Sequence, residues 1–385
     1  MNKRFQPLNI LIIEPYHTGS HASWAGGYKK KSRHNVEILS LEGRYWKWRM
    51  HGGAVTLAGR FLQEGLRPDL ILATDMLDLT TFLALTRRVT AAVPSALYFH
   101  ENQITYPWQP GDRDVANGRD GHYGFINFAS ALAADRVFFN SRYHMDEFLA
   151  GLEAFLKAFP DYNEAAAVGL IKARSSVLYV GMDFALLDSA APEGDGAPRE
   201  DRPPLILWNH RWEYDKNPED FFRALYALDD KGLDFEVAIL GENFKKRPVE
   251  FDEARQRLGE RVVRFGFVED FPSYVRWLKS ADIAPVTSNH DFFGCSVIEA
   301  VRCGCFPILP RRLAYPEHVA EGLNEKIFYS DFDGLLSRLE WAVVNIAEVR
   351  RASLKKNVEK YGWDTLAPIY DREMEDMFIA ARPTA

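Results

Sequence analysis

Short apolar runs alternate with helix-like segments along most of this chain, and that alternation limits the possible folds more than any other feature. Most of the runs in the N-terminal half are rich in Val, Ile, Leu and Phe, as strands covered on both faces are. They are Asn9–Glu14, Asn35–Ser40, Leu70–Ala73, Ala96–His100, Arg136–Asn140 and Ser176–Tyr179. The pattern predicts an α/β fold in which helices flank a parallel sheet.

The alternation stops at residues 187–204, where four prolines, two glycines and many charges replace the apolar runs. Such a stretch cannot bury a core and is typical of a linker. Beyond it, helices are predicted at 218–228 and 296–302, between strands at Leu205–Trp208, Phe235–Leu240, Val262–Phe265, Ile283–Thr287 and Phe306–Leu309. One core rarely exceeds about 250–300 residues, and the chain has 385. We therefore predict two Rossmann-like, doubly wound domains, residues 1–186 and 205–362, with an inter-domain cleft and ligands at the carboxyl ends of the strands.

Charge is distributed unevenly along the sequence. The net charge of −7 argues against a broadly basic nucleic-acid binder, yet residues 1–50 carry nine Lys or Arg and only three acidic residues. A local basic face can steer a polyanion, and a merely solvated surface is the alternative.

The sequence has no feature typical of a secreted or membrane protein. The apolar run Leu8–Ile13 is too short for a signal peptide, and no stretch approaches the roughly 18 apolar residues of a membrane span. Cys295, Cys303 and Cys305 are odd in number and lack the spacing of metal ligands or of a disulfide framework. A cytoplasmic protein with reduced thiols is predicted.

The most informative segment is residues 288–307. It places Asp291 in a loop, Gly294 at the start of a helix and Glu299 inside that helix. Backbone N–H groups at a helix N-terminus favour phosphate, and a carboxylate in the helix can accept both hydroxyls of a ribose. The segment resembles the E-x7-E signature of retaining glycosyltransferases of family 4, although Asp291 is one methylene shorter than the usual Glu. The resemblance implies that Asp291 contacts the transferred hexose, that Glu299 binds the ribose, and that Phe293 and Gly294 contact the donor.

A second segment, residues 209–218, follows the first strand of the C-terminal domain. Arg211 offers a fork for bidentate phosphate contact and Lys216 a point charge, and the two can neutralise a departing diphosphate. Family 4 enzymes carry an Arg and a Lys five residues apart at this place, and this pair keeps that spacing.

Other loops after predicted strands also carry candidate donor contacts. Glycine permits close backbone approach to phosphate, but Gly19 does not have the spacing of a dinucleotide fingerprint, so hydride chemistry loses support. His100 resembles the family 4 histidine beside the transferred sugar. The resemblance extends the donor contacts to Gly19, Ser20, His21, Asn140, Gly241, Glu242 and Phe267.

Matching segments run in one order along the chain and point to a branch of family 4. They are residues 12–14, 19–21, 46–49, 98–103, 106–107, 123–127, 139–141, 210–216 and 292–299. Together they resemble the tRNA-queuosine alpha-mannosyltransferase family. That resemblance implies the GT-B fold, GDP-mannose as donor and the cyclopentenediol of queuosine in the tRNA-Asp anticodon as acceptor. By likeness to similar enzymes, a helix at Trp363–Ala381, within residues 363–385, is expected to return to the N-terminal domain.

The tRNA acceptor gives the N-terminal basic excess a role, because cations interleaved with aromatic rings suit an anticodon loop. The alternative is a basic helix end and two core Trp residues. The candidate acceptor contacts are Lys29, Lys30, Lys31, Arg33, Trp46, Lys47, Trp48, Arg49, Glu101, Asn102 and Gln103.

The resemblance implies front-face transfer with retention, and no metal or other cofactor. Arg211 and Lys216 would stabilise the leaving diphosphate while Asp291 and His100 position the hexose. The Asp-x-Asp sequence at 112–114 lies well past the nearest strand and is expected to be solvated, with no metal role.

Three other functions stay open at this point. A family 4 enzyme acting on a lipid-linked or polysaccharide acceptor would use a basic, membrane-facing helix, and Lys29–Lys31 could belong to one. A non-catalytic tRNA- or nucleotide-binding module and a nucleotide-sugar isomerase are the others. The predicted partners are a tRNA and a nucleotide sugar, without a membrane.

Overall fold

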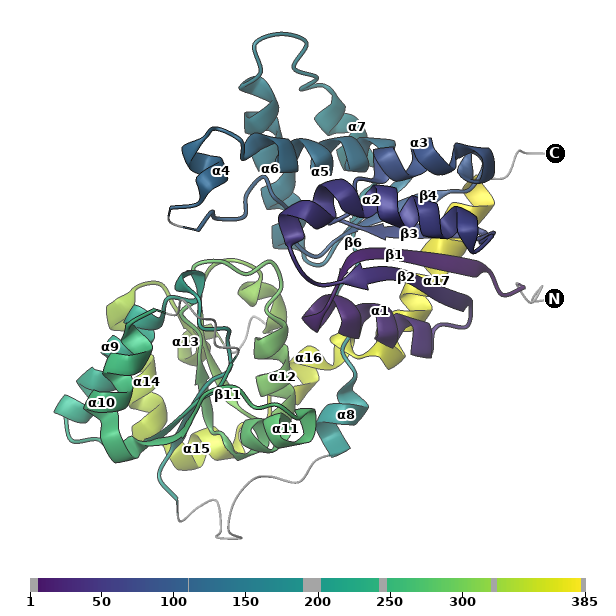
Figure 1. The fold of residues 1–385 in the computed structure, drawn as a ribbon. Coiled ribbons are helices and arrows are strands. Elements are labelled where there is room, and N and C mark those ends of the chain that lie inside the picture. Colours follow the sequence, from purple (N-terminus) through teal and green to yellow (C-terminus); the bar gives the residue numbers. More distant parts are fainter. Residues whose placement is uncertain (1–5, 110, 190–201, 242–247, 320–323, 382–385) are drawn as a thin grey trace. The chain divides into compact units, whose positions relative to one another are not determined.

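The structure is a computed structural model, and it describes residues 6–109, 111–189, 202–241, 248–319 and 324–381. The chain forms two compact units, coloured by sequence in Figure 1. Unit 1 comprises residues 1–182 and 361–385, and unit 2 comprises residues 183–360. Each unit contains one six-stranded sheet whose paired strands are parallel. The predicted α/β class with two doubly wound sheets is confirmed.

The sheet of unit 1 has the order β2-β1-β3-β4-β5-β6. Its six strands all overlap those predicted from the apolar runs. They are β1 (Asn9–His17), β2 (Asn35–Glu42), β3 (Leu70–Thr74), β4 (Ser95–Phe99), β5 (Arg136–Phe139) and β6 (Ser175–Val177). The order reverses at β1, because β2 pairs on one side of it and β3 on the other.

Helices cover the sheet of unit 1 and bury its apolar side chains, among them Ile13, Leu97 and Phe139. The helices are α1 (Gly19–Lys31), α2 (Trp46–Gln63), α3 (Leu79–Thr90), α4 (Arg113–Ala116), α5 (Gly121–Ala133), α6 (Arg142–Lys157), α7 (Ala167–Ala173) and α17 (Trp363–Ala380).

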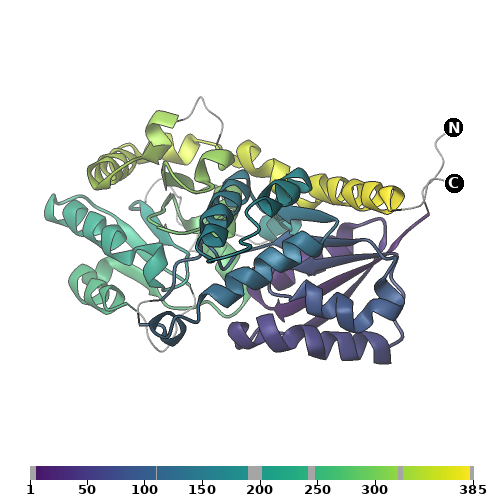
Figure 2. The same cartoon turned by 90° about the horizontal axis from the view of Figure 1, so that it is seen from above.

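Helix α17 comes from the far end of the chain and packs against α1, as Figure 1 shows, and Figure 2 shows it lengthwise along unit 1. The Trp363 ring lies so close to Gly27 and Gly181 that an added Cβ would come within 1.9 and 2.3 Å of it. Trp24 Nε1 also donates a hydrogen bond to the Tyr370 hydroxyl at 3.0 Å. Two glycines and one buried Trp therefore dock the C-terminal helix on unit 1.

The sheet of unit 2 has the order β12-β11-β10-β7-β8-β9. Its strands are β7 (Leu205–Trp208), β8 (Glu236–Ile239), β9 (Val262–Phe265), β10 (Ile283–Pro285), β11 (Phe306–Pro310) and β12 (Phe328–Tyr329). Five of them overlap predicted strands. The two-residue strand β12 has too short an apolar run to be recognised from its sequence.

The helices of unit 2 are α8 (Phe184–Ser189), α9 (Pro218–Asp230), α10 (Glu250–Leu258), α11 (Phe271–Ser280), α12 (Cys295–Cys303), α13 (Asn324–Ile327), α14 (Phe332–Val344), α15 (Ile346–Arg351) and α16 (Lys355–Val358). Short 3-10 helices lie at η2 (Tyr214–Lys216), η3 (Gly259–Arg261), η4 (Tyr315–His318) and η6 (Glu359–Tyr361). None of the described helices has the length and apolar character needed to cross a membrane.

The structure corrects the start of the predicted linker. Leu187 is buried in the core of unit 2 on helix α8, and the neighbouring Asp188 forms an ion pair with Arg302. Local composition did not reveal this helix because Asp188 binds Lys279 and Arg302, which lie 91 and 114 residues away in the sequence. Residues 190–201 of the predicted linker lie outside the described residues.

Candidate functional site

Unit 2 brings two of the predicted segments together at its topological switch point. The strand order reverses between β7 and β10, which pair in the sheet. In doubly wound folds the connections diverge at such a point and leave a crevice outside the carboxyl ends. Arg211 and Lys216 follow β7, and Asp291 follows β10.

Lys216 is the centre of this arrangement. Its Nζ donates a hydrogen bond to the carbonyl oxygen of His290 at 2.8 Å, and it lies 3.1 Å from Asp215 Oδ2 and 3.4 Å from Asp291 Oδ1. Burial by itself would lower the pKa of Lys216, but the carboxylates of Asp291 and Asp215 raise it above its usual value. Lys216 therefore stays charged and ties the loop after β7 to the loop after β10.

Asp291 is held from two sides. The Tyr315 hydroxyl donates to Oδ2 at 2.7 Å, while Oδ1 faces Lys216. Burial would raise the pKa of Asp291, but the charge of Lys216 and the hydrogen bond from Tyr315 keep it below its usual value. An ionised carboxylate in a fixed position can accept hydrogen bonds from hydroxyls or stabilise positive charge that develops on a sugar ring.

Glu299 lies on α12, eight residues after Asp291. The Tyr274 hydroxyl donates to its Oε2 at 2.7 Å, and Asn209 Nδ2 donates to the Tyr274 oxygen at 3.2 Å and to the Ser296 carbonyl at 2.8 Å. Burial raises the pKa of Glu299 to about 7. This series of hydrogen bonds fixes a carboxyl group whose charge changes near neutral pH.

Arg211 differs from Lys216 in its exposure. Its side chain is 48% exposed and pairs with Glu213, with Nη2 3.1 Å from Oε2. The adjacent His210 is buried, lies 3.0 Å from Ser296 Oγ through its Nδ1, and has its pKa lowered to about 4 by burial. His210 is therefore neutral and supports the loop, whereas the Arg211 guanidinium can reach an anion in solution.

Two predicted glycines occupy backbone positions that exclude a side chain. Gly294 is the N-cap of α12 with φ of 88°, and a Cβ there would come within 3.0 Å of the Tyr315 ring. Gly241 has φ of 109°, and a Cβ there would lie 1.9 Å from the His210 carbonyl oxygen. Both glycines let a loop approach the switch point closely. The neighbouring Glu242, a predicted donor contact, lies outside the described residues.

Two predicted aromatic contacts of unit 2 differ in accessibility. Phe267 is 53% exposed on the turn after β9, so its contact with a ligand stays a prediction. The Phe293 ring is buried and packs on His318 with ring centroids 5.1 Å apart. The ring thus serves as the apolar anchor of the loop between β10 and α12, and a donor contact by Phe293 stays a prediction.

In unit 1 the switch point lies at β1, and two predicted histidines meet beside its carboxyl end. Glu14 is fully buried, and its carboxylate accepts from the Tyr16 backbone N–H at 2.8 Å and lies 3.0 Å from His21 Nδ1. The His21 and His100 rings lie 4.1 Å apart, although they follow different strands. Gly19 and Ser20 are exposed on the first turn of α1 beside them.

The two imidazoles of unit 1 differ in charge. Burial would lower the pKa of His21, but the Glu14 carboxylate raises it to about 9. Burial and the charge of His21 lower the pKa of His100 well below its usual value. His100 Nε2 is buried and has no hydrogen-bond partner among the described residues. A cationic imidazole thus lies beside a neutral one that still has hydrogen-bonding capacity for a ligand.

The backbone of His100 is fixed by buried neighbours. Its N–H donates to Asp75 Oδ1 at 2.8 Å, and its carbonyl accepts from Asn140 Nδ2 at 2.8 Å. Asn140 Oδ1 also lies 2.7 Å from His144 Nδ1. Asn140, a predicted donor contact, thus uses its side chain to position the end of β4.

Within the described residues, Glu14, His21 and His100 are the group that could hold a metal, because one ligand atom of each lies within 4.8 Å of the others. The carboxylate of this group is already used by His21 and by the Tyr16 N–H. An acid paired with an imidazolium accounts for the geometry, so the group fits a metal poorly.

The predicted acceptor contacts after β4 serve partly in the local turn. Asn102 is fully buried, and its Oδ1 accepts from the backbone N–H of Ile104 and Thr105 at 3.0 and 2.9 Å. Gln103 Nε2 donates to Glu101 Oε1 at 2.9 Å. The prediction for Asn102 is wrong because its amide closes this turn, whereas Glu101 and Gln103 stay predictions.

The predicted basic cluster separates into two parts in the structure. Lys31 pairs with Asp364 at 2.7 Å, and Arg33 pairs with Glu375 of the same helix, α17. Residues 29–31 form the last turn of α1 while His21 lies in its first, a separation of about 12–15 Å at 1.5 Å per residue. Lys31 and Arg33 thus help to dock α17, and their contact with an acceptor stays a prediction. Lys29 and Lys30 stay predictions.

Lys47 also has an intramolecular function. Its Nζ lies 2.7 Å from an Asp112 carboxylate oxygen and 2.5 Å from one of Asp114, and it lies over the Trp108 ring. The Asp-x-Asp carboxylates are therefore ion-paired and only partly exposed, which corrects the prediction that they are merely solvated, while an RNA contact by Lys47 stays a prediction. Trp46 packs against Trp108, with ring centroids 6.0 Å apart, as the alternative of a core Trp predicted.

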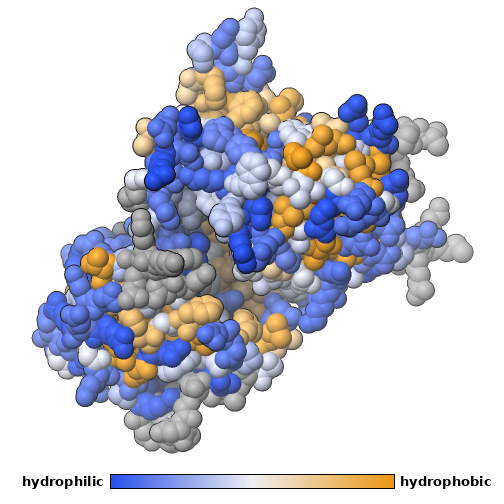
Figure 3. All heavy atoms as spheres, viewed as in Figure 1, coloured by the Kyte–Doolittle hydropathy of each residue, from blue (hydrophilic) through white to orange (hydrophobic). Residues whose placement is uncertain are grey.

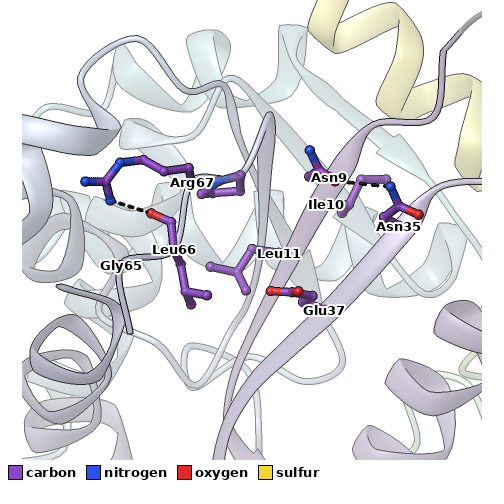
Figure 4. A pocket seen from close by; sticks show the side chains of 9 residues that line it. Asn9, Ile10, Leu11, Asn35, Glu37, Gly65, Leu66 and Arg67 are labelled. Carbon is purple, nitrogen blue, oxygen red and sulfur yellow. Dashed lines mark hydrogen bonds between the residues drawn. The ribbon is translucent and has the colours of Figure 1, made fainter. Parts of the chain in front are cut away.

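A separate pocket of about 220 Å³ lies elsewhere on unit 1. Figure 4 shows its lining by the first residues of β1 and β2, with Leu66 and Arg67 from the segment before β3. These strands are parallel, so the pocket lies at the opposite edge of the sheet from His21 and His100. We assign it no part in the site.

Several residues of the site were missed by the sequence analysis. Tyr274 donates a hydrogen bond to Glu299, and Tyr315 donates one to Asp291. Asn209 in turn donates a hydrogen bond to the Tyr274 hydroxyl oxygen. The two tyrosines belong to no spaced motif, and Asn209 begins the segment 209–218 without having been assigned a role. Tyr315 follows β11 by five residues, so the rule that ligands bind at strand ends could have indicated its region but not its contact.

Comparisons with known proteins cover both units. Residues 9–182 match a family model described as tRNA-queuosine alpha-mannosyltransferase N-terminal, and residues 203–345 match one described as glycosyl transferases group 1. A Drosophila melanogaster protein named tRNA-queuosine alpha-mannosyltransferase is 36% identical over 313 residues, which cover 80% of this chain and 81% of that protein.

Two further comparisons concern a shorter segment and the fold. A Mycobacterium tuberculosis protein named GDP-mannose-dependent alpha-(1-6)-phosphatidylinositol dimannoside mannosyltransferase is 31% identical over 117 residues, or 30% of each chain. The solved structure of a sucrose-phosphate synthase from Thermosynechococcus elongatus matches with a TM-score of 0.67 at 16% identity, over 97% of this chain and 100% of that one. At this identity the likeness concerns the fold alone, and it agrees with the GT-B fold.

Proposed function

The chain belongs to the tRNA-queuosine alpha-mannosyltransferase family, and from this premise we propose that it transfers mannose from GDP-mannose to the cyclopentenediol of queuosine in tRNA-Asp. The name of the fly relative supports mannose as the hexose and queuosine in tRNA as the acceptor. GDP-mannose is supported by the name of the mycobacterial relative, which depends on that donor.

The observation that carries the reaction is the Lys216–Asp291 pair at the switch point of unit 2, with Glu299 eight residues further on. A buried cation beside the crevice suits the negative charge that accumulates on a departing diphosphate. The exposed guanidinium of Arg211 adds a second, bidentate contact for the same phosphates. Glu299 is assigned to the ribose hydroxyls and Asp291 to the hexose.

We propose front-face displacement with retention of configuration. The acceptor hydroxyl oxygen forms the new bond to the anomeric carbon while the bond from that carbon to the donor phosphate breaks. The departing phosphate oxygen takes the hydroxyl proton, so GDP leaves and no separate base is needed. His100 Nε2 is assigned a hydrogen bond to the hexose, because it is buried and has no partner among the described residues.

The test is incubation of the purified chain with queuosine-containing tRNA-Asp and GDP-mannose, followed by digestion to nucleosides and mass spectrometry. We expect a hexose added to queuosine and no product with the same tRNA lacking queuosine. Asp291→Asn is the inactive control, and UDP-glucose tests the choice of donor. A queuosine mass that is unchanged while GDP-mannose is hydrolysed would contradict the acceptor but not the donor.

The same product tests the stereochemistry. GDP-mannose carries an alpha linkage, so retention predicts that an alpha-mannosidase releases the hexose from the nucleoside. Release by a beta-mannosidase instead would refute front-face displacement.

A further inference from the structure

Two aromatic side chains near the start of helix α2 are exposed. Tyr45 is 78% exposed and Trp48 is 63% exposed. Exposed apolar residues that lie close together, unlike single ones, are typical of an interaction site. They flank Trp46 and Lys47, which are held by contacts inside unit 1.

The backbone and the neighbouring glycine hold these two rings in place. Tyr45 has φ of 52°, a left-handed conformation that is strained for a residue with a side chain and that glycine would adopt freely. The Trp48 indole lies flat along α2 over Gly52, where a Cβ would come within 2.5 Å of the ring. One face of the indole therefore rests on the helix backbone.

The rings lie on the side of unit 1 that carries the histidine pair. Gly43, in the loop before α2, approaches Thr18 so closely that a Cβ would lie 2.3 Å from its methyl group. Gly53 of α2 packs on Pro15, next to Glu14, with 3.1 Å between the two Cβ positions. Tyr45 follows strand β2, and His100 follows strand β4. Neighbouring strands are about 4.8 Å apart, so the three steps from β2 to β4 correspond to about 15 Å.

The charges of this helix favour a polyanion over an acidic or neutral partner. The sequence of α2 contains no acidic residue and three Lys or Arg, of which Lys47 pairs with Asp112 and Asp114 and Arg60 pairs with Glu64. Among the ion pairs of the described residues, none involves Arg49, whose Nε donates to the Glu42 carbonyl at 3.1 Å. Arg49 therefore keeps its charge available beside Trp48.

We propose that Tyr45 and Trp48 form a stacking platform for unpaired bases of the acceptor RNA loop, with Arg49 contacting its phosphates. Proteins bind splayed-out bases of RNA loops by stacking them on aromatic side chains. A base on this platform would leave the neighbouring modified base within reach of His100. The proposal rests on the proposed tRNA acceptor and adds Tyr45 and Gly52 to the residues that decide its binding.

The alternative partner is an anionic membrane, because Val55 and Leu62 are also exposed on α2 and Leu85 on α3. Figure 3 shows apolar residues among polar ones over these two helices. The RNA is favoured because both rings lie at the start of α2, next to the loop in which Gly43 approaches Thr18, whereas Val55 and Leu62 lie further along the helix.

The experiment measures the affinity of the full chain for a fluorescein-labelled anticodon stem-loop RNA by anisotropy. Stacking on one ring contributes about tenfold to binding, so we expect Trp48→Ala to weaken affinity about tenfold and Trp48→Phe to recover part of it. Gly52→Ala keeps every cation and favours the helix, yet it displaces the indole and should weaken binding severalfold. Tyr45→Gly should weaken binding while thermal unfolding shifts to the same or a higher temperature.

The matched control is Tyr162→Gly, because Tyr162 is 87% exposed and also left-handed, with φ of 43°, but lies on the loop between α6 and α7. It should keep the wild-type RNA affinity. At high salt the effect of Trp48→Ala should persist while that of Arg49→Ala shrinks, because only the second is electrostatic.

Two results would overturn the platform. One is wild-type RNA affinity in all three variants at Tyr45, Trp48 and Gly52 while the wild-type chain still mannosylates tRNA. The other is binding to phosphatidylglycerol vesicles that depends on Trp48 while RNA affinity does not. Failure of the wild-type chain to mannosylate tRNA would instead contradict the proposed function itself.

Discussion

Replacing Glu299 with Gln should stabilise the protein while weakening its hold on the nucleotide. Burial raises the pKa of Glu299 to about 7, from 4.5 for the free side chain. A raised carboxyl pKa means that the folded state disfavours the charge. The folded state therefore loses stability as the pH rises from about 4.5 to about 7, and above that range the loss is complete.

The size of this loss follows from the shift. Each pKa unit corresponds to about 1.4 kcal/mol, so the shift of Glu299 corresponds to about 3 kcal/mol. The side chain keeps partial contact with water, which reduces that value. We expect Glu299→Gln to raise the free energy of unfolding by about 1.5–3 kcal/mol near pH 8 and by less than about 1 kcal/mol near pH 5. Gln keeps the size of the side chain and still accepts the hydrogen bond from Tyr274.

The assay is urea unfolding of wild type and variant at both pH values, with titration calorimetry of GDP alongside. The exposed Glu253→Gln on α10 is the control for removal of a charge. GDP affinity should fall about tenfold in Glu299→Gln if the carboxylate binds the ribose diol. A stabilisation that is equal at both pH values, or a variant less stable near pH 8, would refute the reasoning.

Four further outcomes are expected. Arg211→Ala should lower kcat more than it weakens donor binding, because charge develops mainly in the transition state; a kcat equal to wild type would remove its role. Tyr315→Phe removes the hydrogen bond from Tyr315 to the Asp291 carboxylate, and such a bond is worth about 1.5–3 kcal/mol. We therefore expect kcat/KM to fall at least about tenfold. A fall of less than twofold would count against the idea that Tyr315 positions Asp291. Glu14 raises the pKa of His21 to about 9. If the His21 charge contributes to the reaction, kcat/KM should fall as the pH rises through about 9, and Glu14→Gln should move this fall to lower pH. A pH profile that Glu14→Gln leaves unchanged would contradict a role for the Glu14–His21 pair. Activity should survive excess EDTA, and a loss restored by a divalent cation would assign the Glu14 group to a metal.

The sequence by itself determined what depends on short spacings. A strand, a loop with Gly294 and a helix place Asp291 and Glu299 at a constant offset, since helix geometry and glycine conformation act over a few residues. The same local signals predicted the first five strands of unit 2 and all six of unit 1. They also located Arg211 and Lys216 after the strand that proved central to its sheet.

Tertiary structure decided which charges are available. Lys29–Arg33 and Arg44–Arg49 both belong to the basic first fifty residues, but β2 lies between them and places them at opposite ends of the sheet. At one end, Lys31 and Arg33 form ion pairs with carboxylates of α17. At the other end, Lys47 forms ion pairs with Asp112 and Asp114. The partners of such pairs are tens to hundreds of positions apart in the sequence. Periodic patterns within a short segment therefore cannot predict them. The contacts of Tyr315 with Asp291 and of His21 with His100 arise in the same way, because parallel strands bring their carboxyl ends to one edge.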